Sequence, residues 1–117
     1  RRVIVFSCSS EIRRMEPPIT TLMFRRLPRR LVAGELLQEI EAILGRGVVD
    51  FLLLPWKEGI EKNLGYAFVN FLDAEIAAAA QQELQGKLLG RDSTRIVPGD
   101  IQGLRACLER TQQWLES

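Results

Sequence analysis

The chain alternates between short segments with two kinds of apolar spacing. Residues 21–27 alternate apolar and other positions until Pro28, which is typical of a strand and its end. The next segment repeats apolar residues at helical intervals and ends at two glycines; these residues are Leu36, Ile40, Ile43, Leu44, Gly45 and Gly47. The pattern therefore predicts a strand followed by an amphipathic helix.

The same two spacings recur in the rest of the chain. Residues 48–54 form a nearly continuous apolar run that suits a buried strand, residues 55–64 a polar loop, and residues 65–71 the clearest strand. Asp73 suits a helix N-cap, and apolar residues then repeat at helical intervals as far as Gly86. Residues 94–97 predict a last short strand, and residues 104–115 a final helix.

The order of these elements, βαββαβ plus a helix, predicts the α+β, ferredoxin-like fold. In this fold a four-stranded antiparallel sheet carries two helices on one face. Pro17 and Pro18 separate an N-terminal flank from this pattern. We therefore expect a flank at residues 1–19, a folded domain at 20–98, and a C-terminal helical extension at 99–117.

Charge is balanced overall but uneven along the chain. The formal net charge is only +1, so no global field draws the protein to a polyanion or a membrane. Residues 1–30, however, hold eight Arg against two Glu, whereas the remainder is net acidic. An anionic partner is therefore expected to dock on this basic N-terminal segment.

The composition excludes several classes of catalytic and metal-binding site. The chain has no histidine, which excludes Ser-His-Asp triads, Cys-His pairs and histidine metal sites. Cys8 and Cys107 lack metal-site spacing and are expected to be reduced thiols. No apolar run is long enough for a membrane span or a secretory signal. We expect a non-enzymatic monomeric domain without cofactor or metal, inside the cell, in the nucleus, the cytoplasm or both.

The strand at residues 65–71 places two aromatic rings on one face. Tyr66 and Phe68 are two residues apart and project together, while Ala67, Val69 and Phe71 project to the other side. In this topology the helices cover only one face, so the rings can form an open platform on which nucleotide bases stack. Alternatively, the final helix lies over both rings and makes them core residues, and sequence leaves this choice open.

Two segments resemble the signature motifs of the RNA recognition motif family. Residues 64–71, Leu-Gly-Tyr-Ala-Phe-Val-Asn-Phe, resemble its octamer, and residues 22–27, Leu-Met-Phe-Arg-Arg-Leu, resemble its hexamer. A narrower similarity is to the C-terminal RNA recognition motif of Mei2-like proteins. In that subfamily a methionine in the hexamer, here Met23, and an aliphatic residue at the start of the octamer, here Leu64, are usual. Residues 50–52, Asp-Phe-Leu, and 101–103, Ile-Gln-Gly, match that subfamily as well. The resemblance implies an RNA-binding regulator of meiosis or development.

The resemblance also implies roles for individual residues. Tyr66 and Phe68 would stack bases or pack on a ribose, and Met23 would add an apolar contact. Arg25 and Arg26 would reach phosphates or base edges, and Asn70 would read a base edge. For the arginine-rich run, a solvated basic surface is the alternative.

The sequence is compatible with two functions. The first is a single-stranded RNA-binding module that combines stacking with phosphate contacts. The second is a protein-interaction module with a masked sheet, whose partner contacts the final helix or the acidic first helix through Glu35, Glu39 and Glu41. Trp56 is expected to pack against the loop after the second strand, with a stacking ring at the sheet edge as the alternative, and Trp114 is expected to anchor the final helix.

Overall fold

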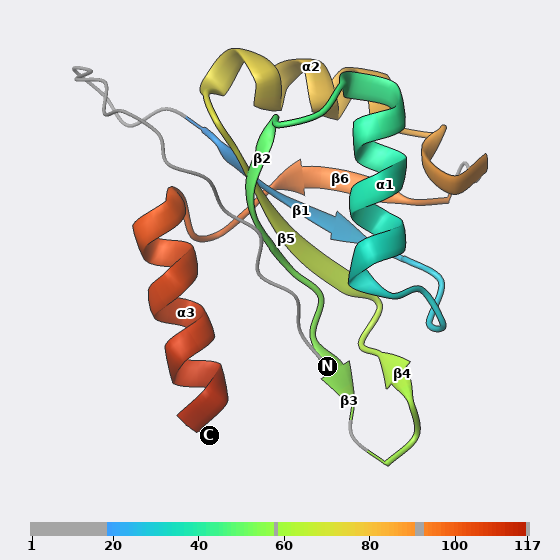
Figure 1. Ribbon diagram of the computed structural model, residues 1–117, viewed down its shortest axis with the longest axis vertical. Coiled ribbons are helices and arrows are strands. Elements are labelled where there is room, and N and C mark those ends of the chain that lie inside the picture. The colour runs from blue at the N-terminus through green and yellow to red at the C-terminus, as the bar shows by residue number, and fades with distance from the viewer. Residues whose placement is uncertain (1–18, 58, 91–92, 117) are drawn as a thin grey trace.

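The computed structural model describes residues 19–57, 59–90 and 93–116. Its main sheet is antiparallel with the order β2-β5-β1-β6, and a separate two-stranded ribbon joins β3 to β4 (Figure 1). The elements in chain order are β1 (Thr21–Arg25), α1 (Ala33–Leu44), β2 (Val49–Leu53), β3 (Trp56–Lys57), β4 (Lys62–Asn63), β5 (Tyr66–Phe71), α2 (Ala74–Leu84), η1 (Leu88–Gly90), β6 (Arg95–Pro98) and α3 (Leu104–Glu116). The predicted ferredoxin-like fold is confirmed.

The main core lies between the sheet and the helices α1 and α2. One face of β1 contributes Leu22 and Phe24, both almost fully buried. The alanine-rich α2 packs closely, because Ala77 and Ala80 point at the sheet and add little bulk. Asp73 caps this helix as predicted, since its Oδ1 accepts a hydrogen bond from Ile76 N at 2.8 Å.

The loop expected at residues 55–64 contains a small hairpin that the sequence did not reveal. Trp56 pairs with Asn63, and Lys57 pairs with Lys62. Asn63 is fully buried and its Nδ2 donates to the carbonyls of Pro28 and Leu31 at 2.8 and 2.9 Å. The hairpin is thereby fastened to the segment between β1 and α1.

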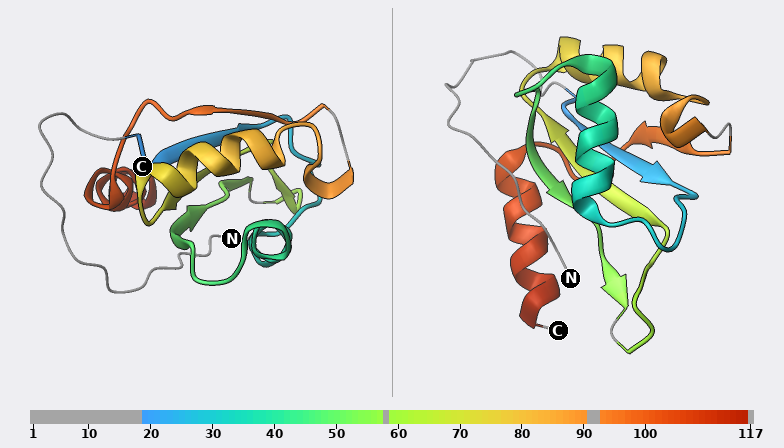
Figure 2. Two further views of the ribbon diagram at one scale, coloured as in Figure 1. Left: turned by 90° about the horizontal axis from the view of Figure 1, so that it is seen from above. Right: turned by 45° about the vertical axis from the view of Figure 1, so that its right-hand side comes forward.

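A second, smaller core lies on the opposite face of the sheet. α3 and α1 stand on opposite sides of the strands (Figures 1 and 2). The buried members of this core are Phe51, Leu53, Phe68 and Cys107, and Met23, Tyr66, Ile101 and Leu104 pack against them. The expectation that this face is open to solvent is therefore wrong for the half formed by β2 and the middle of β5, because α3 covers it.

Some expectations concern residues that the structure does not describe. The N-terminal flank up to residue 18, with the β-like run and Cys8, lies outside the described residues. Within the described part of the chain, none of the helices combines the length and apolarity that crossing a membrane requires.

Candidate nucleic-acid interface

The sheet register brings the predicted aromatic and basic residues together on the face that α3 shares. Met23 lies opposite Phe68, and Arg25 lies opposite Tyr66, across β1 and β5. Because directly opposed residues of an antiparallel pair project from the same face, all four side chains belong to one surface. The Tyr66 and Phe68 rings are in edge contact, with centroids 5.8 Å apart and planes at 81°.

The two rings differ in their access to solvent. Phe68 is only 5% exposed, and it packs in the small core with Cys107 of α3. The guanidinium carbon of Arg110 lies 5.8 Å from the Phe68 ring centroid, within the range of a cation–π contact. Tyr66, two residues earlier, remains partly exposed. In this conformation a base can therefore approach Tyr66 but not the face of Phe68.

Among the described elements, none lies over the part of this face formed by β1, β6 and the start of β5, which we call the uncovered half. Arg25 is exposed, and Met23 is partly exposed. Arg95 of β6 is also exposed and lies directly opposite Arg25, and Val97 lies opposite Met23. Sequence reasoning missed Arg95 because its position beside Arg25 depends on the β1–β6 register.

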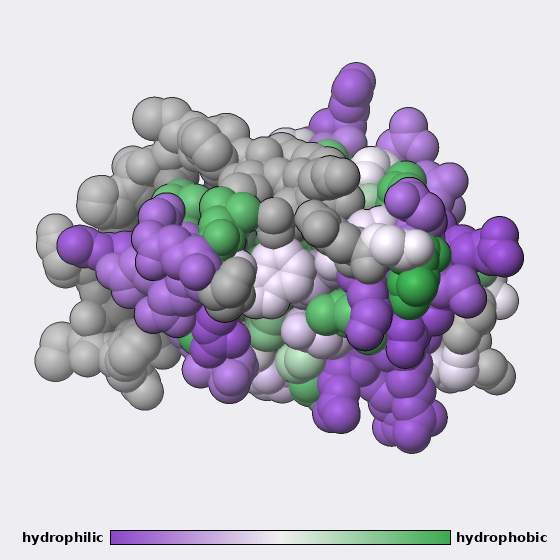
Figure 3. Space-filling view, turned by 90° about the horizontal axis from the view of Figure 1, so that it is seen from below, coloured by the Kyte–Doolittle hydropathy of each residue, from purple (hydrophilic) through white to green (hydrophobic). Residues whose placement is uncertain are grey.

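The hairpin formed by β3 and β4 lies at the lower end of the molecule in Figure 1. Viewed from there, hydrophilic side chains gather on both sides of a paler strip, over the side of α3 and over the side of the hairpin (Figure 3). The hydrophilic side chains thus flank a strip of lower polarity at this end of the molecule.

Asn70 occupies a position that differs from the one its proposed role requires. It is 3% exposed, and its Oδ1 accepts hydrogen bonds from the hydroxyls of Thr21 and Thr20 at 2.6 and 2.8 Å. Its Nδ2 donates to Asp50 Oδ1 at 2.7 Å. Burial raises the pKa of the Asp50 carboxyl above its ordinary value of 3.8, while the Asn70 bond opposes that rise. Asn70 thus joins β1, β2 and β5 and presents no free amide to a base.

Three further arginines, Arg26, Arg29 and Arg30, lie in the segment between β1 and α1. Arg26 is exposed and adopts a left-handed φ of 62°. Arg29 donates from its Nη1 to the Asn63 carbonyl at 3.1 Å and packs against Gly65. A Cβ at Gly65 would lie 3.3 Å from Arg29 Nε, and φ there is +93°, so this position of the octamer favours glycine. Arg30 is exposed.

The predicted Ile-Gln-Gly segment has a clear structural role at Gln102. Its Oε1 accepts from the backbone N–H groups of Thr20 and Thr21, each at 2.9 Å. Its Nε2 donates to the carbonyls of Thr21 and Gly99 at 2.9 and 3.0 Å. The side chain thus replaces strand pairing where β6 has ended, and it fixes the point at which the chain turns into α3.

Cys107 of α3 is a free thiol at the centre of the small core. It is fully buried, and its Sγ lies 3.6 Å from Thr21 Oγ1. Burial raises the pKa of this thiol to about 11. Among the described residues, no group of three or more His, Cys, Asp or Glu side chains is arranged to hold a metal ion.

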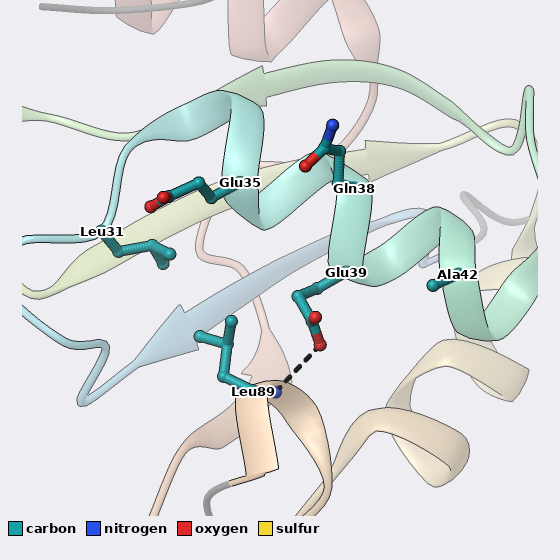
Figure 4. A pocket seen from close by; sticks show the side chains of 6 residues that line it. All are labelled: Leu31, Glu35, Gln38, Glu39, Ala42 and Leu89. Atoms are coloured by element: carbon teal, nitrogen blue, oxygen red, sulfur yellow. Dashed lines mark hydrogen bonds between the residues drawn. The ribbon is translucent and has the colours of Figure 1, made fainter.

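The acidic surface named in the alternative hypothesis lies on the α1 side of the molecule. A shallow pocket of about 460 Å³ is lined by Leu31, Glu35, Gln38, Glu39, Ala42 and Leu89 (Figure 4). Glu39 Oε1 accepts a hydrogen bond from Leu89 N at 3.2 Å, which ties η1 to α1. Glu39 of this acidic surface therefore helps to hold the fold together.

Comparison with known proteins agrees with this architecture. The family RNA recognition motif 2 matches residues 19–112. The chain belongs to this RNA recognition motif family. Protein MEI2-like 3 of Arabidopsis thaliana is 36% identical over 78 residues, which is 67% of this chain and 10% of the relative. Protein MEI2-like 4 of the same plant is 31% identical over 105 residues, or 86% of this chain and 12% of the relative. The chain thus spans only about a tenth of the length of these relatives.

Solved structures of other RNA recognition motifs share the fold. The Rna15 RNA recognition motif with bound RNA (GU) superposes with a TM-score of 0.65 at 20% identity, covering 83% of this chain and 99% of that chain. The first two such domains of yeast poly(U) binding protein Pub1 give a TM-score of 0.57 at 20% identity, covering 78% of this chain and 54% of that chain. These likenesses support the fold, and the similarity to MEI2-like proteins supports the sequence-based assignment.

Proposed function

We propose that this domain binds single-stranded RNA on the uncovered half of its sheet. The observation that carries the proposal is the register of Tyr66 opposite Arg25, which puts a partly exposed ring beside an exposed guanidinium on one face. A base can stack on the ring while the arginine contacts the RNA backbone. Stacking on an aromatic side chain is worth about 1–3 kcal/mol per base, and it tolerates any base.

The position of α3 limits which part of the face is used first. Phe68 is buried beneath α3, whereas Met23 and Val97 remain partly exposed. RNA therefore contacts Tyr66, Met23 and Arg25 with α3 in place. Stacking on Phe68 requires α3 to move away, and the free energy of that movement is subtracted from the binding free energy.

The similarity to known relatives supports a proposal for the biological role of this protein. The similarity to MEI2-like proteins of Arabidopsis thaliana favours a post-transcriptional regulator of meiosis or development. The Rna15 structure, which contains bound RNA, shares the fold of this domain. Together these likenesses favour RNA over other polyanions as the ligand.

Titration with RNA tests the proposal directly. A fluorescent random-sequence single-stranded RNA pool is titrated with wild type, Tyr66→Ala and Tyr66→Phe, with folding checked by circular dichroism. Loss of a stacking contact of about 1 kcal/mol or more weakens binding at least about fivefold in Tyr66→Ala. Tyr66→Phe keeps the ring and should bind as wild type does. Equal binding by folded Tyr66→Ala would place the RNA elsewhere.

A protein-interaction module is the second candidate, and the burial of Phe68 beneath α3 favours it. In that case the masked face serves stability, and a partner contacts α1 or the outer side of α3. The same titration separates the candidates, because a protein-interaction module shows no RNA binding at moderate salt.

A further inference from the structure

Arg25 and Arg95 form an unusual pair at the uncovered half of the sheet. They are directly opposed across β1 and β6, and both side chains are exposed. Directly opposed residues of an antiparallel pair have Cα atoms about 4.5–5.5 Å apart and share a face. Like charges in this relationship destabilise the sheet. The repulsion is relieved when an anion lies between the two guanidinium groups.

The surroundings of the pair leave the charges available to a ligand. Within the described part of the chain, neither guanidinium is joined by a hydrogen bond or an ion pair to another residue. The side chains beside the pair on this face, Tyr66, Met23 and Val97, carry no charge. Neither the row of Tyr66, Arg25 and Arg95 nor the neighbouring row of Phe68, Met23 and Val97 therefore contains a carboxylate that could neutralise the two arginines.

We propose that Arg25 and Arg95 together clamp one phosphodiester group of the bound RNA, next to the base that stacks on Tyr66. Tyr66, Arg25 and Arg95 form one row across β5, β1 and β6. Neighbouring strands are about 4.8 Å apart, so the ring and the clamp are separated by a distance that one nucleotide can span. Guanidinium groups suit this task because their forked donors match phosphate oxygens.

The position of α3 gives the RNA strand its path. The half of the face formed by β2 and the middle of β5 is filled by Phe51, Leu53 and Phe68 under α3. A strand that leaves Tyr66 therefore continues across β1 towards β6, where the clamp lies. This inference rests on the proposed function and adds Arg95 as a binding residue on β6.

Three matched variants test the clamp, and each removes one positive charge. Arg25→Ala and Arg95→Ala remove its two halves. Arg105→Ala is the control, because Arg105 is 93% exposed on α3 and contacts Glu109. Affinity for a fluorescent single-stranded RNA pool is measured over a series of salt concentrations. Each clamp variant should weaken binding about tenfold, the effect of losing a hydrogen bond to a charged group. Arg105→Ala should change the affinity less than about twofold, as expected for an exposed charge away from the ligand.

The double variant shows whether one phosphate is shared. If both arginines hold the same group, Arg25→Ala/Arg95→Ala weakens binding by less than the product of the single effects. The slope of log K against log salt then falls by about 0.7, the value for one phosphate contact on a single strand. A multiplicative loss with twice that change in slope would assign the arginines to two phosphates and overturn the shared clamp.

The outcome also separates the clamp from the proposed function. If Tyr66→Ala weakens binding while Arg95→Ala behaves like Arg105→Ala, RNA binding on the sheet stands and the clamp is wrong. If wild type binds no RNA, both proposals fail. If Arg95→Ala loses RNA affinity while Arg105→Ala does not, β6 is part of the binding surface.

Discussion

The guanidinium carbon of Arg110 lies 5.8 Å from the centroid of the Phe68 ring. This contact joins α3 to the strand that carries the octamer, and α3 covers one of the two aromatic residues that the sequence assigns to base stacking. Phe68 is only 5% exposed, so it contributes to stability in the present conformation. Tyr66, in edge contact with Phe68, then becomes the ring that is accessible to a ligand.

Replacing the two rings should therefore affect stability very differently. Phe68→Ala removes a buried aromatic side chain and should lower the free energy of unfolding by about 3–5 kcal/mol. Tyr66→Ala removes a partly exposed ring and should cost clearly less. Urea unfolding followed by circular dichroism measures both values. Equal costs would contradict the burial of Phe68 by α3.

The reactivity of Cys107 reports on the movement of α3. In a Cys8→Ser background, Cys107 should react slowly with a thiol reagent at pH 8, because it is buried and its pKa is raised to about 11. Arg110→Ala weakens the contact with Phe68 and should speed the reaction in the native state. A rate in native wild type equal to that in denaturant would show that α3 does not protect this thiol.

Asp50 should make stability depend on pH. Burial raises the pKa of its carboxyl above 3.8, so the folded state binds this proton more tightly than the unfolded state. The contribution of Asp50 to stability is then greatest below pH 3.8 and falls as pH rises through the folded pKa. Asp50→Asn retains an oxygen acceptor for Asn70 and removes the charge.

The comparison with Asp50→Asn isolates this effect. Relative to wild type, the variant should gain free energy of unfolding progressively as pH rises from about 4 towards neutrality, where a carboxyl with a raised pKa loses its proton. Urea unfolding across this pH range measures the difference. A variant whose advantage shrinks with rising pH would contradict the assigned direction of the shift.

Asn63 should be important for stability although it lies in a two-residue strand. Its side chain donates to the carbonyls of Pro28 and Leu31 and accepts from Gly65 N. Asn63→Ala leaves these buried groups without partners and should cost at least about 2 kcal/mol, judged from the usual penalty for unsatisfied groups. Lys62→Ala, next to it and exposed, is the control in the same thermal or urea unfolding measurement. Similar small losses in both variants would contradict the anchoring role.

The spacing of apolar residues was enough to predict the order of elements. Alternation along β5 assigns Ala67 and Val69 to the main core and Tyr66 and Phe68 to the other face, as the structure shows. The two-residue strands β3 and β4 were missed because a strand of that length has no detectable period. Their pairing depends on Asn63, which a sequence pattern presents only as a polar loop residue.

The site was harder to predict, because its exposure depends on tertiary packing. The apolar stripe of α3 predicts a helix but not where that helix docks, so the burial of Phe68 could not be read from it. The role of Asn70 depends on Thr21 and Asp50, which are distant in sequence and meet only through strand register. Arg95 becomes a candidate binding residue only because the β1–β6 register places it opposite Arg25.

NMR titration tests most directly whether RNA binds the uncovered half of the sheet. Backbone amide shifts of ¹⁵N-labelled protein are followed as a single-stranded RNA pool is added. The largest changes should occur at β1, the start of β5 and β6, around Arg25, Tyr66 and Arg95, with little change on the outer side of α1. Changes confined to α1, or none at all, would contradict the account.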